Sequence, residues 1–340
     1  MRGTRWTVVL ALGAVAACLA TTAPAQATTT PQLLKRYQPV TVLDPLEPFT
    51  PTDVGGFVGD SVLQAQTSQG VWTTVDEHPT AGTLPRQPTA ACTAQGLNPC
   101  YRLNQSACTP SGGVEADACY RDAWLAGDPR NVVYARVKKA PHKLVLQYWY
   151  FYYDDLYSYD YPQDDLFWQA HEGDWEVVNV VLDRDSQRPL EVAYSQHCTG
   201  TTRDWSQVGK IGTHPVDHVA IGSHANLLDG GSQAVATSCI PAQALQILQA
   251  NGLPAPVDRA GDGTSYGPGS IGSVTPTALR RMGRERTPWI GFAGTWGEYE
   301  VFHAPPPIGT VAPGTTSPVS PALTRLWQRP LTVISGWPRG

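Results

Sequence analysis

The sequence has few charged residues and no excess of positive charge. Charged residues make up 16% of the 340-residue chain, and 29 acidic residues against 24 lysines and arginines give a formal net charge of −5. A protein that holds nucleic acid through its phosphates needs a basic surface, so we expect no nucleic-acid partner. The hydrophobic share of 41% is large enough to build a core and excludes a mostly disordered chain.

Long apolar runs and strong helix patterns are also scarce. After the N-terminus no segment approaches the roughly 20 apolar residues of a membrane-spanning helix, so we expect no transmembrane segment. The best helix candidates are residues 241–250, with proline in the first turn and glycine after the end, and the shorter stretch 275–282. The 32 glycines and 30 prolines favour short strands joined by many turns.

Two aromatic and apolar runs are typical of buried strands. Residues 144–153 read L-V-L-Q-Y-W-Y-F-Y-Y, and residues 174–183 read D-W-E-V-V-N-V-V-L-D, so both are apolar on alternating faces. We therefore expect an all-β fold with few short helices: a β-sandwich with long loops. The predicted organisation is an extended N-terminal segment at 28–50 and a single β-sandwich domain at 51–340.

Residues 1–27 are typical of an export signal. Basic residues precede an apolar run, and Ala25-Gln26-Ala27 forms a cleavage site of the A-x-A type. This pattern predicts a secreted protein. An alternative is a lipid anchor at the cell surface, because Val15-Ala16-Ala17-Cys18 resembles a lipoprotein box in which Cys18 would carry the lipid.

The remaining cysteines predict disulfides. Their number is even, no C-x-x-C pair is present for zinc, and an exported chain reaches an oxidising compartment. Closure of short loops favours pairing between neighbours. Region 91–131, which holds four of the six, would then be a disulfide-stapled excursion. The predicted pairs are Cys92–Cys100, Cys108–Cys119 and Cys198–Cys239.

The densest polar signal is H-E-G-D-W-E at residues 171–176. Strand alternation places Asp174 and Glu176 on one face about 7 Å apart, and a turn at Gly173 can bring His171 to the same end. If the preceding strand pairs antiparallel with this one, the carboxylates of Asp154 and Asp155 arrive at the same edge. Crowded carboxylates need a cation, so this cluster predicts a divalent-metal site. The carboxylates favour calcium or magnesium, and the imidazole leaves manganese and zinc open.

Other interpretations of these residues remain open. The cluster could simply satisfy loop amides at the start of a strand. His197 and His224 could contact the metal ligands without binding the cation themselves, or they could hold loops by hydrogen bonds to backbone. The aromatic stretch 148–168 could stack sugars or lie at a membrane interface, or it could be ordinary core and loop packing.

These motifs also carry a family resemblance. The segment W-Y-F-Y-Y-D at 149–154, followed by H-E-G-D-W-E-V-V at 171–178, resembles the Vps62-related family, in which an H-x-G-D-W-E motif opens a strand. More distantly, it resembles the NPP1-type necrosis-inducing cytolysins, whose G-H-R-H-D-W-E motif follows a W-Y-x-P-x-D segment. Further segments that match the Vps62-related pattern are 37–39, 47–49, 194–197, 214–215, 222–225, 294–297 and 316–318.

The resemblance implies a fold and a cation but no activity. NPP1-type proteins are β-sandwiches similar to sea-anemone pore-formers and fungal lectins, and they hold a divalent cation used in attacking plant membranes. Their ligand pattern falls on His171, Asp174, Glu176 and Asp154 in this sequence. The sequence departs from the motif at Gly173, where the family has its second histidine, so the resemblance does not transfer toxicity. For the Vps62-related family no settled biochemical activity is implied.

Two functions follow as hypotheses. The first is a secreted module that binds a glycan or a lipid headgroup with the help of a divalent cation. The second is a metal-dependent hydrolase that acts on an extracellular polymer or phosphoester, which would need an open coordination position and a base beside it. A serine-hydrolase reading is poorly supported, because no G-x-S-x-G elbow surrounds Ser223. The sequence does not indicate an oligomeric state.

Overall fold

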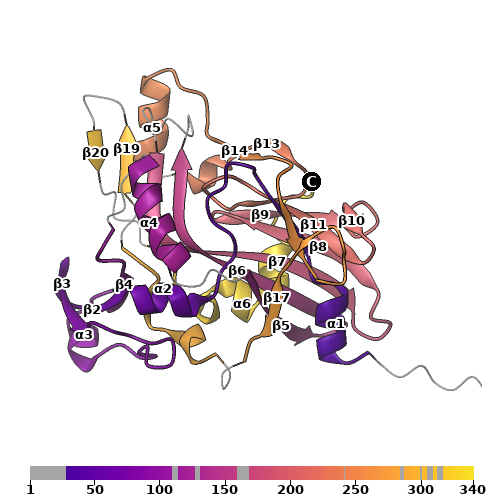
Figure 1. Cartoon of the computed structure of the whole chain (residues 1–340), viewed down its shortest axis with the longest axis horizontal. Helices are drawn as coiled ribbons and strands as arrows, with labels where there is room; N and C mark the ends of the chain where they lie inside the picture. The colour runs from indigo at the N-terminus through magenta and orange to yellow at the C-terminus, as the bar shows by residue number, and fades with distance from the viewer. Residues whose placement is uncertain are drawn as a thin grey trace, which may run out of the picture.

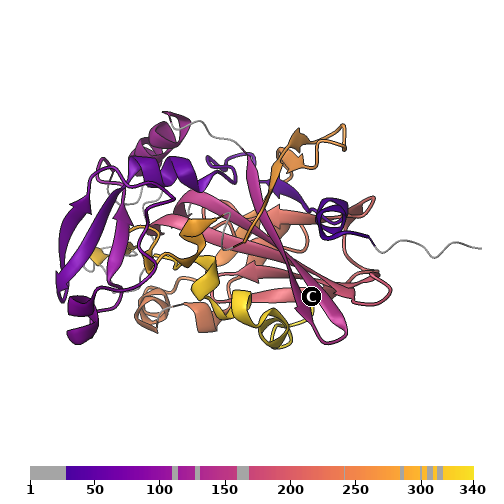
Figure 2. The same ribbon diagram turned by 90° about the horizontal axis from the view of Figure 1, so that it is seen from below.

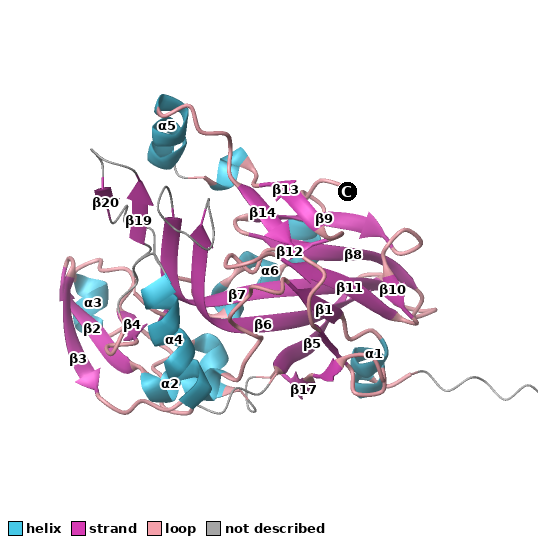
Figure 3. Ribbon diagram, turned by 45° about the horizontal axis from the view of Figure 1, so that its top comes forward, coloured by secondary structure: helices cyan, strands magenta, loops and turns pink. Residues whose placement is uncertain are grey.

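The computed structural model describes residues 28–108, 114–126, 131–158, 168–240, 242–283, 287–298, 301–304, 309–311 and 317–340. The predicted export signal at 1–27, including Cys18, lies outside these residues. Strands predominate and the helices are short (Figure 3), which confirms the all-β, sandwich-like fold. Among the helices described, none has the length and apolar character needed to cross a membrane.

The largest sheet runs through the middle of the molecule (Figure 1). Its strands are β5 (Val132–Ala140), β6 (Lys143–Ser158), β7 (Trp168–Asp183), β8 (Pro189–Gln196), β9 (Thr199–Asp204), β17 (Ala278–Arg281), β19 (Val301–Ala304) and β20 (Gly309–Val311). They are ordered β17-β5-β6-β7-β19-β20, with β8 also beside β7 and β9 beside β8.

A second sheet covers one face of the first. It contains β1 (Val40–Leu43), β10 (Lys210–Ile211), β11 (His214–Val219), β12 (Asn226–Leu227), β15 (Ser265–Gly267) and β16 (Thr275–Pro276). A hydrogen bond joins the two layers, since the Tyr194 hydroxyl donates to the Val216 carbonyl of β11; the Tyr148 hydroxyl donates to the Leu34 carbonyl in helix α1 (Thr30–Arg36). These tyrosines bury their rings between the layers while their hydroxyls are satisfied by backbone.

The remaining elements surround these sheets. A third sheet, at the lower left of Figure 1, has the order β18-β4-β2-β3, and β13 pairs with β14. Their bounds are β2 (Val62–Ser68), β3 (Val71–Asp76), β4 (Tyr101–Asn104), β18 (Gly294–Thr295), β13 (Gly231–Ala234) and β14 (Val257–Ala260). The helices are α1 (Thr30–Arg36), α2 (Val54–Asp60), α3 (Ala90–Ala94), α4 (Val114–Ala126), α5 (Ala242–Ala250), α6 (Arg325–Gln328), α7 (Pro330–Ile334), and the 3-10 turns η1 (Thr237–Cys239), η2 (Pro288–Gly291) and η3 (Pro321–Leu323).

Strands β6 and β7 are the two apolar runs of the sequence. They pair antiparallel in one register from Lys143 opposite Asp183 to Ser158 opposite Trp168. The second sheet covers one face, and the C-terminal helices α6 and α7, yellow in Figure 2, pack on the other. Burial on both faces explains why these runs are apolar at nearly every position.

The outer edge of β7 is shared by two partners. Residues 168–170 pair with β19, and residues 178–182 pair with β8. Among the described strands, none pairs with this edge over residues 171–177. That stretch contains the H-E-G-D-W-E motif, and the backbone of Trp296 and Gly297 packs closely against Glu172 and Gly173 there.

The three disulfides join the predicted neighbours. Cys92 pairs with Cys100, Cys108 with Cys119, and Cys198 with Cys239, which confirms the predicted pairing. Region 91–131 is more than a stapled excursion, however. It supplies strand β4 and helix α4, whose Leu103 and Tyr120 side chains are buried in the core.

Several local predictions have clear outcomes. The helix predicted at 241–250 is α5, but 275–282 forms strands β16 and β17 instead of a helix. Residues 28–50 were expected to be extended, yet they contain helix α1 and strand β1. Leu33 and Leu34 of α1 are buried, and β1 lies inside the second sheet between β11 and β15.

Candidate metal centre

Three side chains on β6 and β7 form a possible metal site. Ligand atoms of Asp155, His171 and Asp174 all lie within 4.8 Å of one another, and His171 Nε2 is 3.9 Å from an Asp155 carboxylate oxygen. The two carboxylates are buried, whereas His171 is partly exposed. The group could therefore hold a cation that is reached from solvent on the histidine side.

A glycine determines which residues meet there. Gly173 has a φ of +62°, and a Cβ at this position would lie 2.5 Å from the Trp296 carbonyl oxygen. The positive φ interrupts the strict alternation of side chains at the point where Gly173 faces Tyr153. As a result, Asp155 and His171 reach the face that carries Asp174, although strict alternation would place them on the other face.

Asp154, the predicted fourth ligand, lies outside this group. It pairs in register with Glu172, and both stand near the Tyr120 hydroxyl on the opposite face of the sheet. Glu172 accepts hydrogen bonds from Tyr120 and from the backbone N–H of Gln105 and Glu298. Burial raises the pKa of Glu172 to about 8. The structure thus separates two buried acidic clusters, one on each face.

Glu176 shares a face with Asp174, as the alternation predicts. Its carboxylate accepts a hydrogen bond from the Ser195 hydroxyl, and Ser195 Oγ also accepts one from the Val177 N–H at 2.8 Å. Burial and then the Asp174 charge hold the pKa of Glu176 well above its usual range. Glu176 therefore lies next to Asp174, outside the three-residue group, in surroundings that favour its neutral form.

His224 supports Asp174 from the second sheet side. Its Nδ1 lies 3.2 Å from an Asp174 carboxylate oxygen and its Nε2 lies 3.3 Å from Glu47, while its ring stacks on Tyr152 at 3.8 Å. The ring is completely buried. Burial opposes protonation, but the two carboxylates outweigh it, and the pKa of His224 is raised well above its ordinary value. The imidazolium holds Asp174 in place.

His197 lies at the other side of the centre. Its Nε2 is 3.0 Å from Asp258, which also accepts a hydrogen bond from the Ser223 hydroxyl. Burial lowers the pKa of His197, but the Asp258 carboxylate outweighs burial and raises the pKa to about 9. His197 and His224 therefore both act as fixed positive charges near the carboxylates, as residues behind the ligands would.

The crowding of buried carboxyl groups in the centre suits a cation. Burial raises the pKa of Asp155 to about 7, with His171 lowering it and the Asp174 charge raising it further. One oxygen of Asp155 is buried and has no hydrogen-bond partner among the described residues. A divalent cation would supply that partner and offset the repulsion between the carboxylates.

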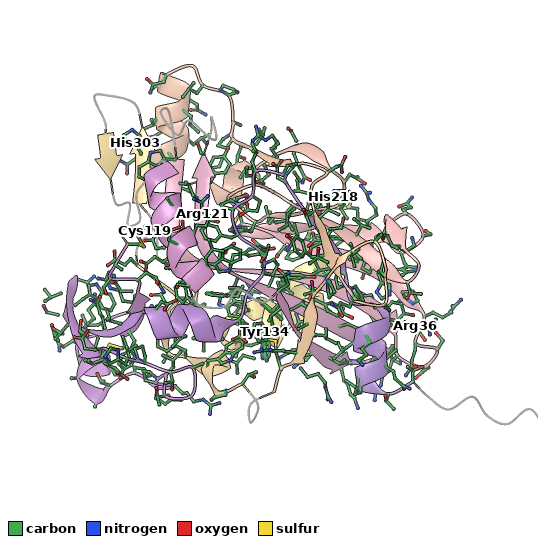
Figure 4. All side chains as sticks on the ribbon, in the orientation of Figure 1. Arg36, Cys119, Arg121, Tyr134, His218 and His303 are labelled. Carbon is green, nitrogen blue, oxygen red and sulfur yellow. A yellow bond between two sulfur atoms is a disulfide. The ribbon has the colours of Figure 1, made fainter. Side chains whose placement is uncertain are left out.

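Two further histidines lie elsewhere (Figure 4). His218 on β11 faces Asp262 at 4.0 Å, and His303 on β19 stacks on Trp168. Neither belongs to the three-residue group.

A small cavity adjoins the centre. Its volume is about 30 Å³, and its walls include Tyr157, Gln169, His197 and Ile240. Gln169 and His171 are two residues apart on β7, so the cavity opens beside the histidine of the centre. The space is large enough for one or two waters or a hydroxymethyl group.

Comparison with known proteins gives only a distant structural likeness. No family model and no curated protein matches the sequence. One solved structure is Necrosis and Ethylene inducing Protein 2 from the causal agent of cocoa's witches' broom disease, with a TM-score of 0.31 and 17% identity over 60% of this chain and 69% of that one. Another, described as "Toxin fold as basis for microbial attack and plant defense", has a TM-score of 0.31 and 16% identity over 58% and 67%.

The resemblances to the Vps62-related and NPP1-type families stay predictions. At these TM-scores the likeness supports no conclusion about what the chain binds.

Several residues of the centre escaped the sequence analysis. Antiparallel pairing placed both Asp154 and Asp155 at this edge, and the family resemblance then selected Asp154 as the ligand, although the glycine between two acidic residues was a visible sign of a break in alternation. Glu47 and Asp258 lie far from the motif in sequence. Only the tertiary fold brings them to His224 and His197, so no local pattern could have identified them.

Proposed function

We propose that this protein is an exported binding module that holds a divalent cation at Asp155, His171 and Asp174 and uses it to bind a hydroxyl-rich ligand, a glycan or a lipid headgroup. The observation that carries the proposal is that ligand atoms of these three residues lie within 4.8 Å of one another and that one of the residues, His171, is partly exposed. A cation held in this way keeps positions free for ligand hydroxyls.

The surroundings of the site support binding more than catalysis. A hydrolase would need a base next to a metal-bound water. His197 and His224 are the nearby imidazoles, and both are already held by carboxylates: His197 Nε2 lies 3.0 Å from Asp258, and the His224 nitrogens lie 3.2 Å from Asp174 and 3.3 Å from Glu47. The adjoining cavity is the size of a single small group, which suits recognition of a hydroxymethyl or a hydroxyl. Export is supported by the three disulfides, which persist in oxidising compartments.

Thermal melting with and without chelator tests the cation. A cation that binds only the folded state stabilises it by about 2.7 kcal/mol at a hundredfold excess over its dissociation constant. We expect the melting temperature to fall in EDTA and to recover with millimolar calcium, magnesium, manganese or zinc. The metal that gives the largest recovery identifies the preferred ion.

A matched pair of variants assigns the effect to the site. Asp174→Asn removes one ligand charge at nearly constant shape and should abolish the response to EDTA. Asp185→Asn removes the same charge at an exposed position and should leave the response unchanged. If the wild-type melting curve is the same in EDTA and in all four metals, the cation proposal is wrong.

The ligand is tested by glycan and lipid-headgroup arrays probed with and without EDTA. Binding that disappears in EDTA and in Asp174→Asn supports the proposal. Binding that persists under both conditions separates the ligand from the cation and contradicts it.

A further inference from the structure

A second, basic groove lies on the opposite face of the main sheet from the candidate metal centre. Its walls include Arg86, Gln87, Lys138, Ile290, Trp327 and Gln328, and its volume is about 870 Å³. Trp327 of α6 packs against Trp149, on the face of β6 that points away from Tyr152 and His224. Figure 2 shows α6 in yellow on this underside.

The charge of the groove differs from that of the whole chain. Arg86 and Lys138 are positive, and no described residue of its walls is acidic, although the chain carries a net charge of −5. Within the described part of the chain, neither cation has a carboxylate or hydrogen-bond partner. Unpaired cations gathered in a concave surface attract anions, because the low-dielectric walls concentrate their field.

The groove is built from fixed parts. The Arg86 side chain passes close over Gly291, where a Cβ would lie 3.6 Å from its Nε. The preceding residue is anchored as well, since the Pro85 carbonyl accepts a hydrogen bond from the Ala293 N–H at 2.8 Å. These contacts hold one wall of the groove in place before any ligand arrives.

Arg136 stiffens the other wall and adds positive charge. Its guanidinium lies 3.4 Å from the centre of the Trp327 ring and donates to the Trp327 carbonyl oxygen at 2.7 Å. Arg136 and Lys138 are two residues apart on β5, so they share one face of the strand. The groove therefore has two cations in its walls, Arg86 and Lys138, with Arg136 in contact with Trp327 of the wall, and it also presents apolar and amide groups.

From this arrangement we propose that the groove binds an acidic polysaccharide, a chain of sugars that carry carboxylate or sulfate groups. Arg86 and Lys138 pair with the anionic groups. The Gln87 and Gln328 amides bond to hydroxyls, and the exposed Leu323 and partly exposed Trp327 side chains cover the C–H faces of the sugar rings. The volume is within the range typical of ligand pockets. This inference is independent of the cation site and goes beyond it.

Binding measured in EDTA tests the groove apart from the metal centre. The probes are polygalacturonate for carboxylates, heparin for sulfates, and neutral dextran. We expect the wild-type protein to bind one or both acidic polymers and not dextran, and binding to weaken in about 0.5 M salt because exposed charges are screened. The Asp174→Asn variant should bind as the wild type does, which distinguishes this proposal from the cation proposal.

Charge variants assign the binding to the groove. Arg86→Gln with Lys138→Gln should weaken binding tenfold or more. Lys139→Gln with Arg184→Gln removes the same charge at exposed positions and should change binding less than twofold. Melting temperatures confirm that both variants are folded.

Three outcomes overturn the proposal. The first is that the wild type binds neither acidic polymer at low salt. The second is that the control variant loses as much affinity as the groove variant, which would mean only diffuse charge attraction. The third is that phosphatidylserine vesicles bind while both polymers fail, which would make the groove a contact surface for anionic lipid.

Discussion

Gly173 determines which side chains meet at the candidate metal centre. Its positive φ shifts the alternation of β7, and its missing side chain admits the Trp296 carbonyl. Both features are visible in the sequence only as a glycine inside a strand, which is a known sign of a close backbone approach or an irregular strand.

The substitution Gly173→Ala should destabilise the protein by more than about 2 kcal/mol, because it combines a strained φ with a Cβ only 2.5 Å from a backbone oxygen. Denaturant unfolding measures the loss. Gly212→Ala is the control: Gly212 has a similar φ of +64°, but a Cβ there meets nothing within 4 Å. The explanation fails if the two variants lose the same stability.

The difference between Asp154 and Asp155 shows what sequence could and could not predict at the residue scale. His171, Asp174 and Glu176 were placed correctly near one another because strand alternation and a glycine turn are local features. Which aspartate of β6 joins the group depends on a break in side-chain alternation that β6 and β7 share. That break depends in turn on the Trp296 backbone, which packs against Gly173.

At the scale of elements, the sequence was most informative where burial was strongest. Strands β6 and β7 were predicted because both of their faces are covered. The stretch 275–282 was misread as helix because its strand β17 is held by parallel pairing with Val132–Ala135 of β5, a long-range contact that leaves no pattern in the segment itself. Helix α1 did carry a local signal: Thr29 and Gln32 form a capping box with proline in the first turn.

The disulfide Cys198–Cys239 ties the turn between β8 and β9 to η1, and its cysteines are 41 residues apart in the sequence. Replacing both cysteines by serine should cost about 4 kcal/mol, because the cross-link restricts a long loop in the unfolded chain. The matched replacement of Cys92 and Cys100, only 8 residues apart, should cost about 2.5 kcal/mol. Equal melting temperatures for the two double variants would contradict this order.

At the scale of the whole molecule, stability should depend on pH through the pair His197–Asp258, which joins the turn after β8 to β14. The pKa of His197 rises from an ordinary 6.5 to about 9 in the folded protein. A raised pKa gives stability that is fully present below the unfolded pKa and lost as the pH rises through the folded pKa. This contribution should therefore disappear between about pH 6.5 and pH 9.

The variant Asp258→Asn tests this dependence. It should lower the free energy of unfolding by about 2 kcal/mol at pH 6, and the gap from the wild type should shrink by pH 10. Asp262→Asn, at an exposed partner of His218, serves as the control and should show no such trend. A gap for Asp258→Asn that stays constant from pH 6 to pH 10 would exclude His197 as its source.

The break in side-chain alternation at Gly173 determines how β7 should respond to the insertion or deletion of a residue. The side chains of β7 that face the second sheet stand at odd positions before Gly173 and at even positions after it. Positions 171, 174 and 176 therefore form a single class facing the second sheet, although no constant period of two includes all three. An insertion or deletion of one residue next to Gly173 would restore a constant alternation of side chains along β7. The three ligand residues would then no longer share one face, although most of the strand's hydrogen bonds would remain.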